Sequence, residues 1–293
     1  MALPFIPSDA GLLALQAGVV AAPRRAPEIP QLARFRSPAW AAVPIGSIVV
    51  VVFAIRYVSD TATGLTYLAL VAVPPLAVVA LAWAMRGREP GRRRTAAAVA
   101  ITALLFALAW AFHKSLVGDA SAALLSALSC VTLGVLLGAV APPGWLKLGI
   151  LAMAAADTWL VVSDLLQAPN ATLIAAHPIG NLPQLQSELF GSVSMGYGDL
   201  FVAGLLGALL AADRRRQWRA ALLTLVLAAL FDLLFLAISE LPATVPVALA
   251  LIVVEVGDRR PGRSFSELWR IRTDRGNGNA KVRAAATPGR PRT

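Results

Sequence analysis

Acidic residues inside long apolar segments are the feature of this sequence that could do chemistry. Four of them, Asp157, Asp199, Asp232 and Glu255, fall within segments that are otherwise almost uncharged. A carboxylate inside a membrane-spanning helix costs roughly 2.5–3.5 kcal/mol on insertion scales, so each is a functional-site candidate. Two carboxyl groups in contact cannot both be ionised and therefore share a proton. Such a pair can activate a water molecule with one acid and protonate a peptide carbonyl with the other, without a metal or cofactor.

Two of these acids are expected to lie at similar depths. Asp157 follows Lys147 by ten residues, and Asp199 precedes Asp213 by fourteen. At about 1.5 Å per residue these intervals are ~15 and ~21 Å. Both are measured from the cytoplasmic end of the helix, and the two helices are consecutive and antiparallel. The sequence therefore predicts that Asp157 and Asp199 meet near the middle of the bilayer.

Two glycines lie just before the second acid. Asp199 belongs to the segment Met195–Leu200, with the sequence MGYGDL, which opens an apolar run that continues to Ala211. Gly196 and Gly198 remove side-chain bulk beside the acid, so we expect a neighbouring helix to approach closely there.

The composition indicates a membrane protein with many spans. The chain has 293 residues, of which 58% are hydrophobic and 14% are charged, and these proportions are typical of polytopic membrane proteins. The net charge of +10 comes from arginine blocks between apolar runs and in the tail, as in the positive-inside rule, so we expect no nucleic-acid partner. A single cysteine, Cys130, and two widely separated histidines predict no disulfide, no metal and no cofactor.

Apolar runs near the ~20 residues needed for a span predict an all-α, polytopic transmembrane helical bundle. About eight spans are expected, or nine if residues 1–22 also cross, at 39–58, 64–85, 95–113, 119–141, 146–166, 189–212, 218–239 and 241–256. Residues 1–37 are interpreted as a cytoplasmic or interfacial segment, 38–256 as the membrane domain, and 257–293 as a basic, disordered cytoplasmic tail. The arginine blocks predict a multi-pass protein of the cell membrane with a cytoplasmic C-terminus. The excess of arginine over lysine is typical of bacteria.

Three segments in the second half of the chain carry a resemblance. They are Asp157 with the apolar run after it, Gly196–Tyr197–Gly198–Asp199, and Pro242–Ala243–Thr244. In order and spacing, across about residues 146–256, they resemble the motifs of the presenilin and signal peptide peptidase family of GxGD intramembrane aspartyl proteases. The resemblance implies a presenilin-like fold, catalytic Asp157 and Asp199, and a substrate-positioning role for Gly196, Tyr197, Gly198, Pro242, Ala243 and Thr244. It also implies that the partners are transmembrane helical substrates or signal peptides in the lipid bilayer.

The sequence departs from that family at several positions. Ala156 stands where the family has tyrosine, Thr244 where it has leucine, and Pro246 comes one residue later than in presenilins. The related type IV prepilin peptidases have similar MGYGD segments but carry a lysine two residues after the aspartate, where this chain has Phe201. The expected orientation is similar to that of signal peptide peptidases, which implies substrates with cytoplasmic N-termini.

Two other functions remain open from the sequence. A proton-coupled transporter could use Asp157, Asp199 and Asp232 as a relay, and it would give Asp232 a role that the protease mechanism does not. Against it, no internal repeat relates the two halves of the chain. A protease-like fold that only binds helices is the third interpretation.

Overall fold

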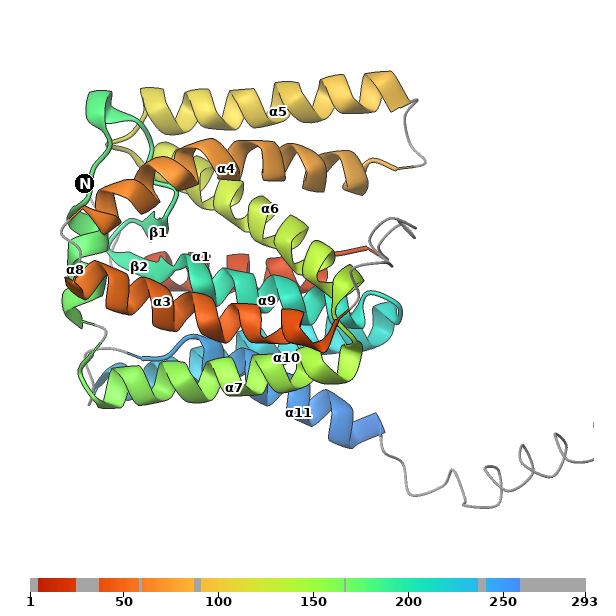
Figure 1. Ribbon diagram of the computed structural model, residues 1–293. Helices are drawn as coiled ribbons and strands as arrows, with labels where there is room; N and C mark the ends of the chain where they lie inside the picture. Colours follow the sequence, from red (N-terminus) through yellow and green to blue (C-terminus); the bar gives the residue numbers. More distant parts are fainter. Residues whose placement is uncertain are drawn as a thin grey trace, which may run out of the picture. The chain divides into compact units, whose positions relative to one another are not determined.

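The computed structural model describes residues 5–24, 37–57, 60–86, 91–165, 167–236 and 241–258 (Figure 1). This part of the chain is mostly helical, with ten α-helices and one β-hairpin. The helices are α1 (Phe5–Ala21), α3 (Val43–Tyr57), α4 (Thr61–Ala84), α5 (Gly91–Ala111), α6 (Leu116–Val140), α7 (Pro143–Val162), α8 (Gln167–Ala175), α9 (Tyr197–Leu210), α10 (Arg214–Phe231) and α11 (Thr244–Asp258). Short 3₁₀ segments are η1 (Pro38–Ala42), η2 (Ile179–Asn181) and η3 (Asp232–Leu236), and the strands are β1 (Ser187–Phe190) and β2 (Val193–Gly196).

The chain divides into two compact units, residues 1–254 and residues 255–293. Of the second unit, the structure describes only Glu255–Asp258, the last residues of α11. The tail expected over 257–293 therefore lies outside the described residues apart from Gly257 and Asp258.

Five helical segments are long and apolar enough to cross a membrane, which indicates a multi-pass membrane protein. They are α4, α5, α6, α7 and the segment Arg214–Leu234, which contains α10. They match the runs expected at 64–85, 95–113, 119–141, 146–166 and 218–239.

The other three expected spans are shorter, so a total of eight or nine is not confirmed. Helices α3 and α11 have 15 residues and α9 has 14. At 1.5 Å per residue they extend about 21–23 Å, short of the ~30 Å of a bilayer core. The run at 39–58 begins with η1, and the run at 189–212 begins with strand residues.

Helix α1 is an integral part of the first unit. The sequence predicts a membrane domain that begins at residue 38, but α1 packs against α9, α10, α6 and both strands. Its residues Leu12, Leu13, Val19 and Val20 are buried. An apolar run of this length is too short to be recognised as a span, so only its tertiary contacts reveal that α1 belongs to the bundle.

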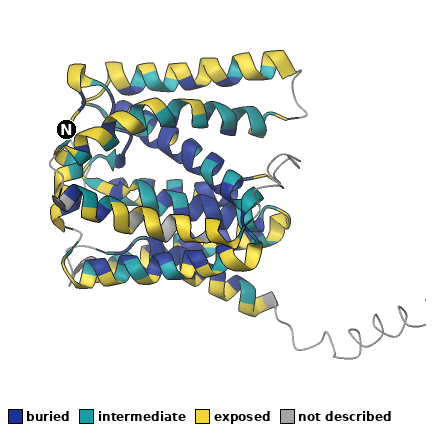
Figure 2. Ribbon diagram, viewed as in Figure 1, coloured by how far each residue is buried: buried dark blue, intermediate teal, exposed yellow. Residues whose placement is uncertain are grey.

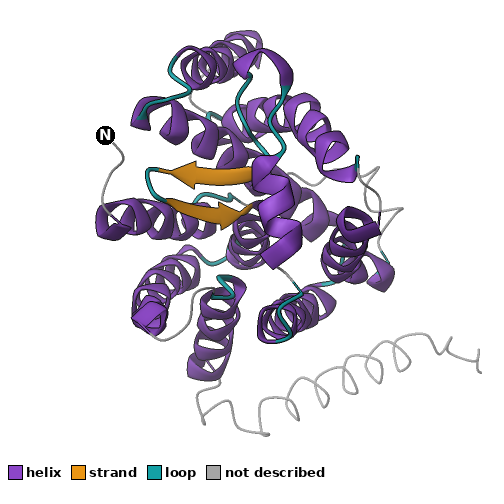
Figure 3. Cartoon of the chain, turned by 90° about the vertical axis from the view of Figure 1, so that its left-hand side faces the viewer, coloured by secondary structure: helices purple, strands orange, loops and turns teal. Residues whose placement is uncertain are grey.

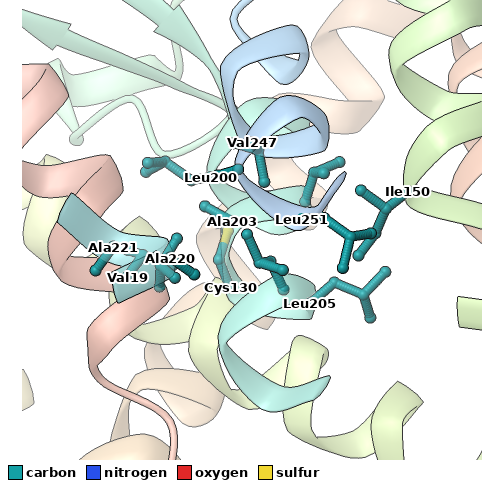
Figure 4. Packing of buried hydrophobic residues seen from close by; sticks show 14 of the residues in the cluster. Val19, Cys130, Ile150, Leu200, Ala203, Leu205, Ala220, Ala221, Val247 and Leu251 are labelled. Atoms are coloured by element: carbon teal, nitrogen blue, oxygen red, sulfur yellow. The ribbon is translucent and has the colours of Figure 1, made fainter. Parts of the chain in front are cut away.

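Helix α9 occupies the centre of the core. Leu200, Val202, Ala203, Leu205 and Leu206 are fully buried, as expected for a helix that is apolar on all sides. Side chains from α1, α6, α7, α10 and α11 converge on it (Figure 4). By contrast, α5 exposes most of its residues (Figure 2), which suits a helix that faces lipid.

Close helix crossings depend on glycines within α6 and α9. A Cβ atom added at Gly134 would lie 2.5 Å from the backbone of Gly204, and one added at Gly204 would lie 2.5 Å from the Cys130 carbonyl oxygen. At Gly207 an added Cβ would meet the Val20 carbonyl oxygen of α1. Small residues at such positions allow backbones to approach closely. The close approach expected at Gly198 is ordinary instead, because a Cβ there would lie 3.7 Å from Met153 Cε.

A β-hairpin precedes α9 and departs from the expected all-α fold (Figure 3). Its antiparallel register pairs Ser187 with Gly196 and Glu188 with Met195. The two-residue turn Gly191–Ser192 joins the strands, and Gly191 has a φ of 63°, which such turns require. Helix α9 consequently begins only at Tyr197.

Candidate active site

Asp157 lies on α7 and is 5% exposed. The Thr244 hydroxyl donates a hydrogen bond of 2.6 Å to Asp157 Oδ2, and the Thr244 backbone N–H also donates to this carboxyl group. Thr244 is the first residue of α11, so the carboxyl group of Asp157 lies at the N-terminal end of that helix.

Asp199 lies in the first turn of α9 and is half-buried. The Gly196 backbone N–H donates a 3.1 Å hydrogen bond to Asp199 Oδ2. A Cβ at position 196 would lie only 3.1 Å from the same oxygen. Glycine at 196 therefore leaves room for the carboxyl group to fold back onto the start of its own helix.

The structure brings the two acids together, since their carboxyl groups lie close enough to interact electrostatically. Helices α7 and α9, which carry them, pack against each other. Both acids lie at helix N-termini, Asp157 at that of α11 and Asp199 at that of α9. The positive end of a helix dipole stabilises a negative charge at each place. The arrangement therefore suits a pair that carries one negative charge and one proton.

Tyr197 supports the start of α9 from the side of α6. Its hydroxyl shares a 2.6 Å hydrogen bond with Ser129 Oγ, and its backbone carbonyl accepts from Cys130 Sγ at 3.8 Å. Tyr197 thus fixes the first turn, which carries Asp199, to α6.

The Pro242–Ala243 carbonyls already have hydrogen-bond partners. The Pro242 carbonyl accepts from Val245 N at 3.1 Å, and the Ala243 carbonyl accepts from Gln16 Nε2 at 3.0 Å. Both carbonyls therefore already accept a hydrogen bond within the protein. These contacts fix the segment that places Thr244 against Asp157.

Gln16 is a site residue that sequence reasoning missed. It is fully buried on α1, and its amide links α1 to the Ala243 carbonyl, 227 positions away. A lone glutamine in the short apolar run of α1 is the one signal in the sequence, and it does not indicate which group the glutamine binds.

Glu188 was also missed, although it lies in β1 beside the pair. It is 1% exposed, and neither carboxyl oxygen has a hydrogen-bond partner. Burial, and then the neighbouring carboxyl group of Asp199, raises the pKa of Glu188 well above its usual value. The signal that could have found it is the Gly191–Ser192 pair between two four-residue strands, which is typical of a hairpin.

Asp232 interacts with a different acid. It ends α10 and begins η3, and its carboxyl group is hydrogen-bonded to that of Asp9 on α1. One oxygen, Asp232 Oδ2, is buried without a hydrogen-bond partner. The structure thus contains a second carboxyl pair, formed with an acid from the N-terminal helix.

In the described part of the chain, no group of three or more His, Cys, Asp or Glu residues could hold a metal ion. A search of protein-family models, curated proteins and solved structures finds no match for this chain. The site geometry and the motif segments therefore carry the functional argument.

Proposed function

We propose that the protein is an intramembrane aspartyl endopeptidase that hydrolyses peptide bonds within or near transmembrane segments or signal peptides. The observation that carries the proposal is the proximity of Asp157 and Asp199. Hydrogen bonds from Thr244 and Gly196 hold one oxygen of each acid. The resemblance of the GYGD and Pro-Ala segments to the GxGD proteases supports the same assignment.

The proposed reaction uses one shared proton. The ionised aspartate takes a proton from water as the oxygen attacks the scissile carbonyl carbon, while the protonated aspartate donates its proton to the carbonyl oxygen. The resulting diol collapses as the C–N bond breaks. The aspartate that took the water proton passes it to the leaving nitrogen, and the other recovers its proton from the diol hydroxyl. The pair thereby returns to its starting state.

The substrate must present an extended peptide to these acids, because a helix hides its carbonyls in internal hydrogen bonds. The hairpin supports this requirement, since within the described residues each strand is paired along one edge only. An unpaired edge can bind an extended segment by strand addition. Strand β2 leads directly into the turn that carries Asp199, so a segment added there would lie near the pair.

The same proposal includes the location of the protein. We infer a bacterial cell-membrane protein with a cytoplasmic C-terminus, from the arginine blocks of the sequence. Substrates would then have cytoplasmic N-termini, as the resemblance to signal peptide peptidases implies.

The test is cleavage of a model single-span peptide, inserted with its N-terminus cytoplasmic, by the full chain in liposomes. Asp157→Asn and Asp199→Asn should abolish cleavage while leaving the fold intact, because asparagine has nearly the same size and keeps a side-chain oxygen that can accept the same hydrogen bond. Asp164→Asn is the matched control, since Asp164 is exposed just beyond α7 and should cleave like the wild type.

Two results would overturn the proposal. One is the absence of cleavage across peptides of different sequence under conditions in which the wild type is folded. The other is unchanged cleavage by both asparagine variants.

The Asp9–Asp232 pair favours a second candidate, a proton-coupled transporter. A second pair of acids gives a relay more proton-binding positions than a protease needs. Its test is proton flux into liposomes, which Asp232→Asn should suppress, while a protease without a relay shows no such flux.

A further inference from the structure

Glu188 is the one buried acid beside the pair to which the proposed reaction gives no role. Its side chain is 1% exposed, and both carboxyl oxygens lack a hydrogen-bond partner. A buried carboxyl group in this condition is expensive to maintain. Residues kept in that state are candidates for a role in the site they face.

The hairpin register places Glu188 one residue from the strand position opposite Gly196. Gly196, whose N–H binds Asp199 Oδ2, is the cross-strand partner of Ser187, and Glu188 follows Ser187. Directly opposed residues in an antiparallel pair lie about 4.5–5.5 Å apart. The Glu188 carboxyl group, on the neighbouring position, is close enough to interact electrostatically with that of Asp199.

The elements packed against β1 supply few other ionisable groups. From α6 they are Cys130, which interacts with Glu188, and Asp119, which accepts a 3.3 Å hydrogen bond from Gly191 N at the hairpin turn. Strand β2 has none, and α1 has only Asp9, which is bonded to Asp232. Helix α9 contributes Tyr197 besides Asp199.

The nearby hydroxyl of Ser126 is already engaged. It is close enough to influence the Glu188 carboxyl group, but it donates to the Leu185 carbonyl at 3.2 Å. No cation faces Glu188 from these elements, whose described residues include no lysine or arginine. Asp199 is therefore its main electrostatic neighbour.

We propose that Glu188 is a third carboxyl group of the site, a positioning residue that keeps the shared proton on the Asp157–Asp199 pair at higher pH. The inference rests on the proposed protease function. On ionising as the pH rises, Glu188 places a negative charge beside Asp199. Its negative charge then opposes a second negative charge on Asp199, so the pair loses its proton only at higher pH.

The first test is the pH profile of peptide cleavage by the full chain in liposomes. Glu188→Gln keeps the size of the side chain and removes its charge, so the alkaline limb of the profile should move to lower pH by about one pH unit. At a fixed pH on that limb the rate should fall about tenfold, while the rate near neutral pH changes little. Glu188→Met should move the limb in the same direction.

The matched control is Asp119→Asn, which removes an acid that binds the same hairpin at its turn. It should leave the alkaline limb in place. A purely structural role for Glu188 would lower the rate equally at all pH values without moving the limb, and that result would overturn the inference.

A second measurement does not depend on activity. Infrared titration of the protonated-carboxyl band would compare the wild type, Glu188→Gln, Asp199→Asn and the double variant. Each single change should lower the titration midpoint of the remaining carboxyl groups, and the combined effect should depart from the sum of the two.

The two measurements separate the two proposals. Coupling in the infrared titration without any cleavage would remove the protease function and keep the three-carboxyl cluster. Cleavage with additive titrations and an unmoved alkaline limb would keep the protease and remove the role of Glu188.

Discussion

Two carboxyl pairs lie in the same unit but in opposite helix environments. Asp157 and Asp199 each accept hydrogen bonds at a helix N-terminus, where the helix dipole stabilises a negative charge. Asp232 caps the C-terminal end of α10, where the dipole opposes one, and it is bonded to Asp9. The same side-chain chemistry therefore suits a general base in the first pair and a hydrogen-bonded contact between α1 and α10 in the second.

Replacing an acid by asparagine should distinguish the two pairs most clearly. Asp157→Asn and Asp199→Asn should each lower the cleavage rate by at least about 100-fold. Asp9→Asn and Asp232→Asn should leave it within about twofold, because an amide can still make the hydrogen bond of that contact. Initial rates on a single-span peptide measure both. A large loss of cleavage rate in Asp232→Asn would show that the two pairs act together and would support the proton relay of a transporter.

Removing the hydroxyl that holds Asp157 should have the next largest effect. Thr244→Val keeps the shape of the side chain and removes the bond to Asp157 Oδ2. A hydrogen bond to a charged group contributes about 1.5–3 kcal/mol, so the cleavage rate should fall roughly 10- to 100-fold. Thr244→Ser keeps a hydroxyl and should restore most of the rate. Equal rates in the two variants would show that Thr244 does not orient the acid.

The first pair also depends on the close crossing of α6 and α9. Gly204→Ala places a methyl group 2.5 Å from the Cys130 carbonyl oxygen, so the helices must separate, at a cost of about 1–3 kcal/mol. Thermal unfolding should show a lower midpoint and cleavage should weaken. Gly18→Ala is the control, because nothing lies within 4 Å of an added Cβ there. A lower unfolding midpoint in the control alone would contradict the contribution of the close α6–α9 crossing to stability.

The smallest expected effect is the pH dependence of stability caused by Glu188. Burial raises the pKa of Glu188 in the folded state, so above its unfolded value of about 4.3 the folded state binds more protons than the unfolded one. The free energy of unfolding contributed by this group is therefore full below that value and falls as the pH rises, by up to about 1.4 kcal/mol per pH unit. Unfolding midpoints measured from about pH 5 to about pH 8 should fall less in Glu188→Gln than in the wild type. If the unfolding midpoints of the two proteins changed in parallel with pH, Glu188 would be exposed to water in the folded state.

Much of the site could be anticipated because helix geometry converts sequence spacing into depth. Counting about 1.5 Å per residue from Lys147 and Asp213 placed Asp157 and Asp199 at similar levels, and the structure brings them into interaction. The segment around Pro242 was also singled out. The specific bond from Thr244 was not, although this residue is the one that departs from the family motif.

The rest depended on contacts that hydropathy does not report. Residues 187–196 contain enough apolar side chains to resemble the start of a span, and the hairpin turn within them is two residues long. Asp9 and Gln16 lie in a run too short to span a bilayer, so their partners, Asp232 and Ala243, follow only from the way α1 packs.

The contact between Gln16 and Ala243 also has a consequence for biosynthesis. The two residues are 227 positions apart, so α1 is made long before α11, and the Gln16 amide can find this partner only after residue 243 has been added. The Thr244 hydroxyl that orients Asp157 arrives at the same moment. A growing chain therefore cannot complete the proposed site until the start of α11 has been made.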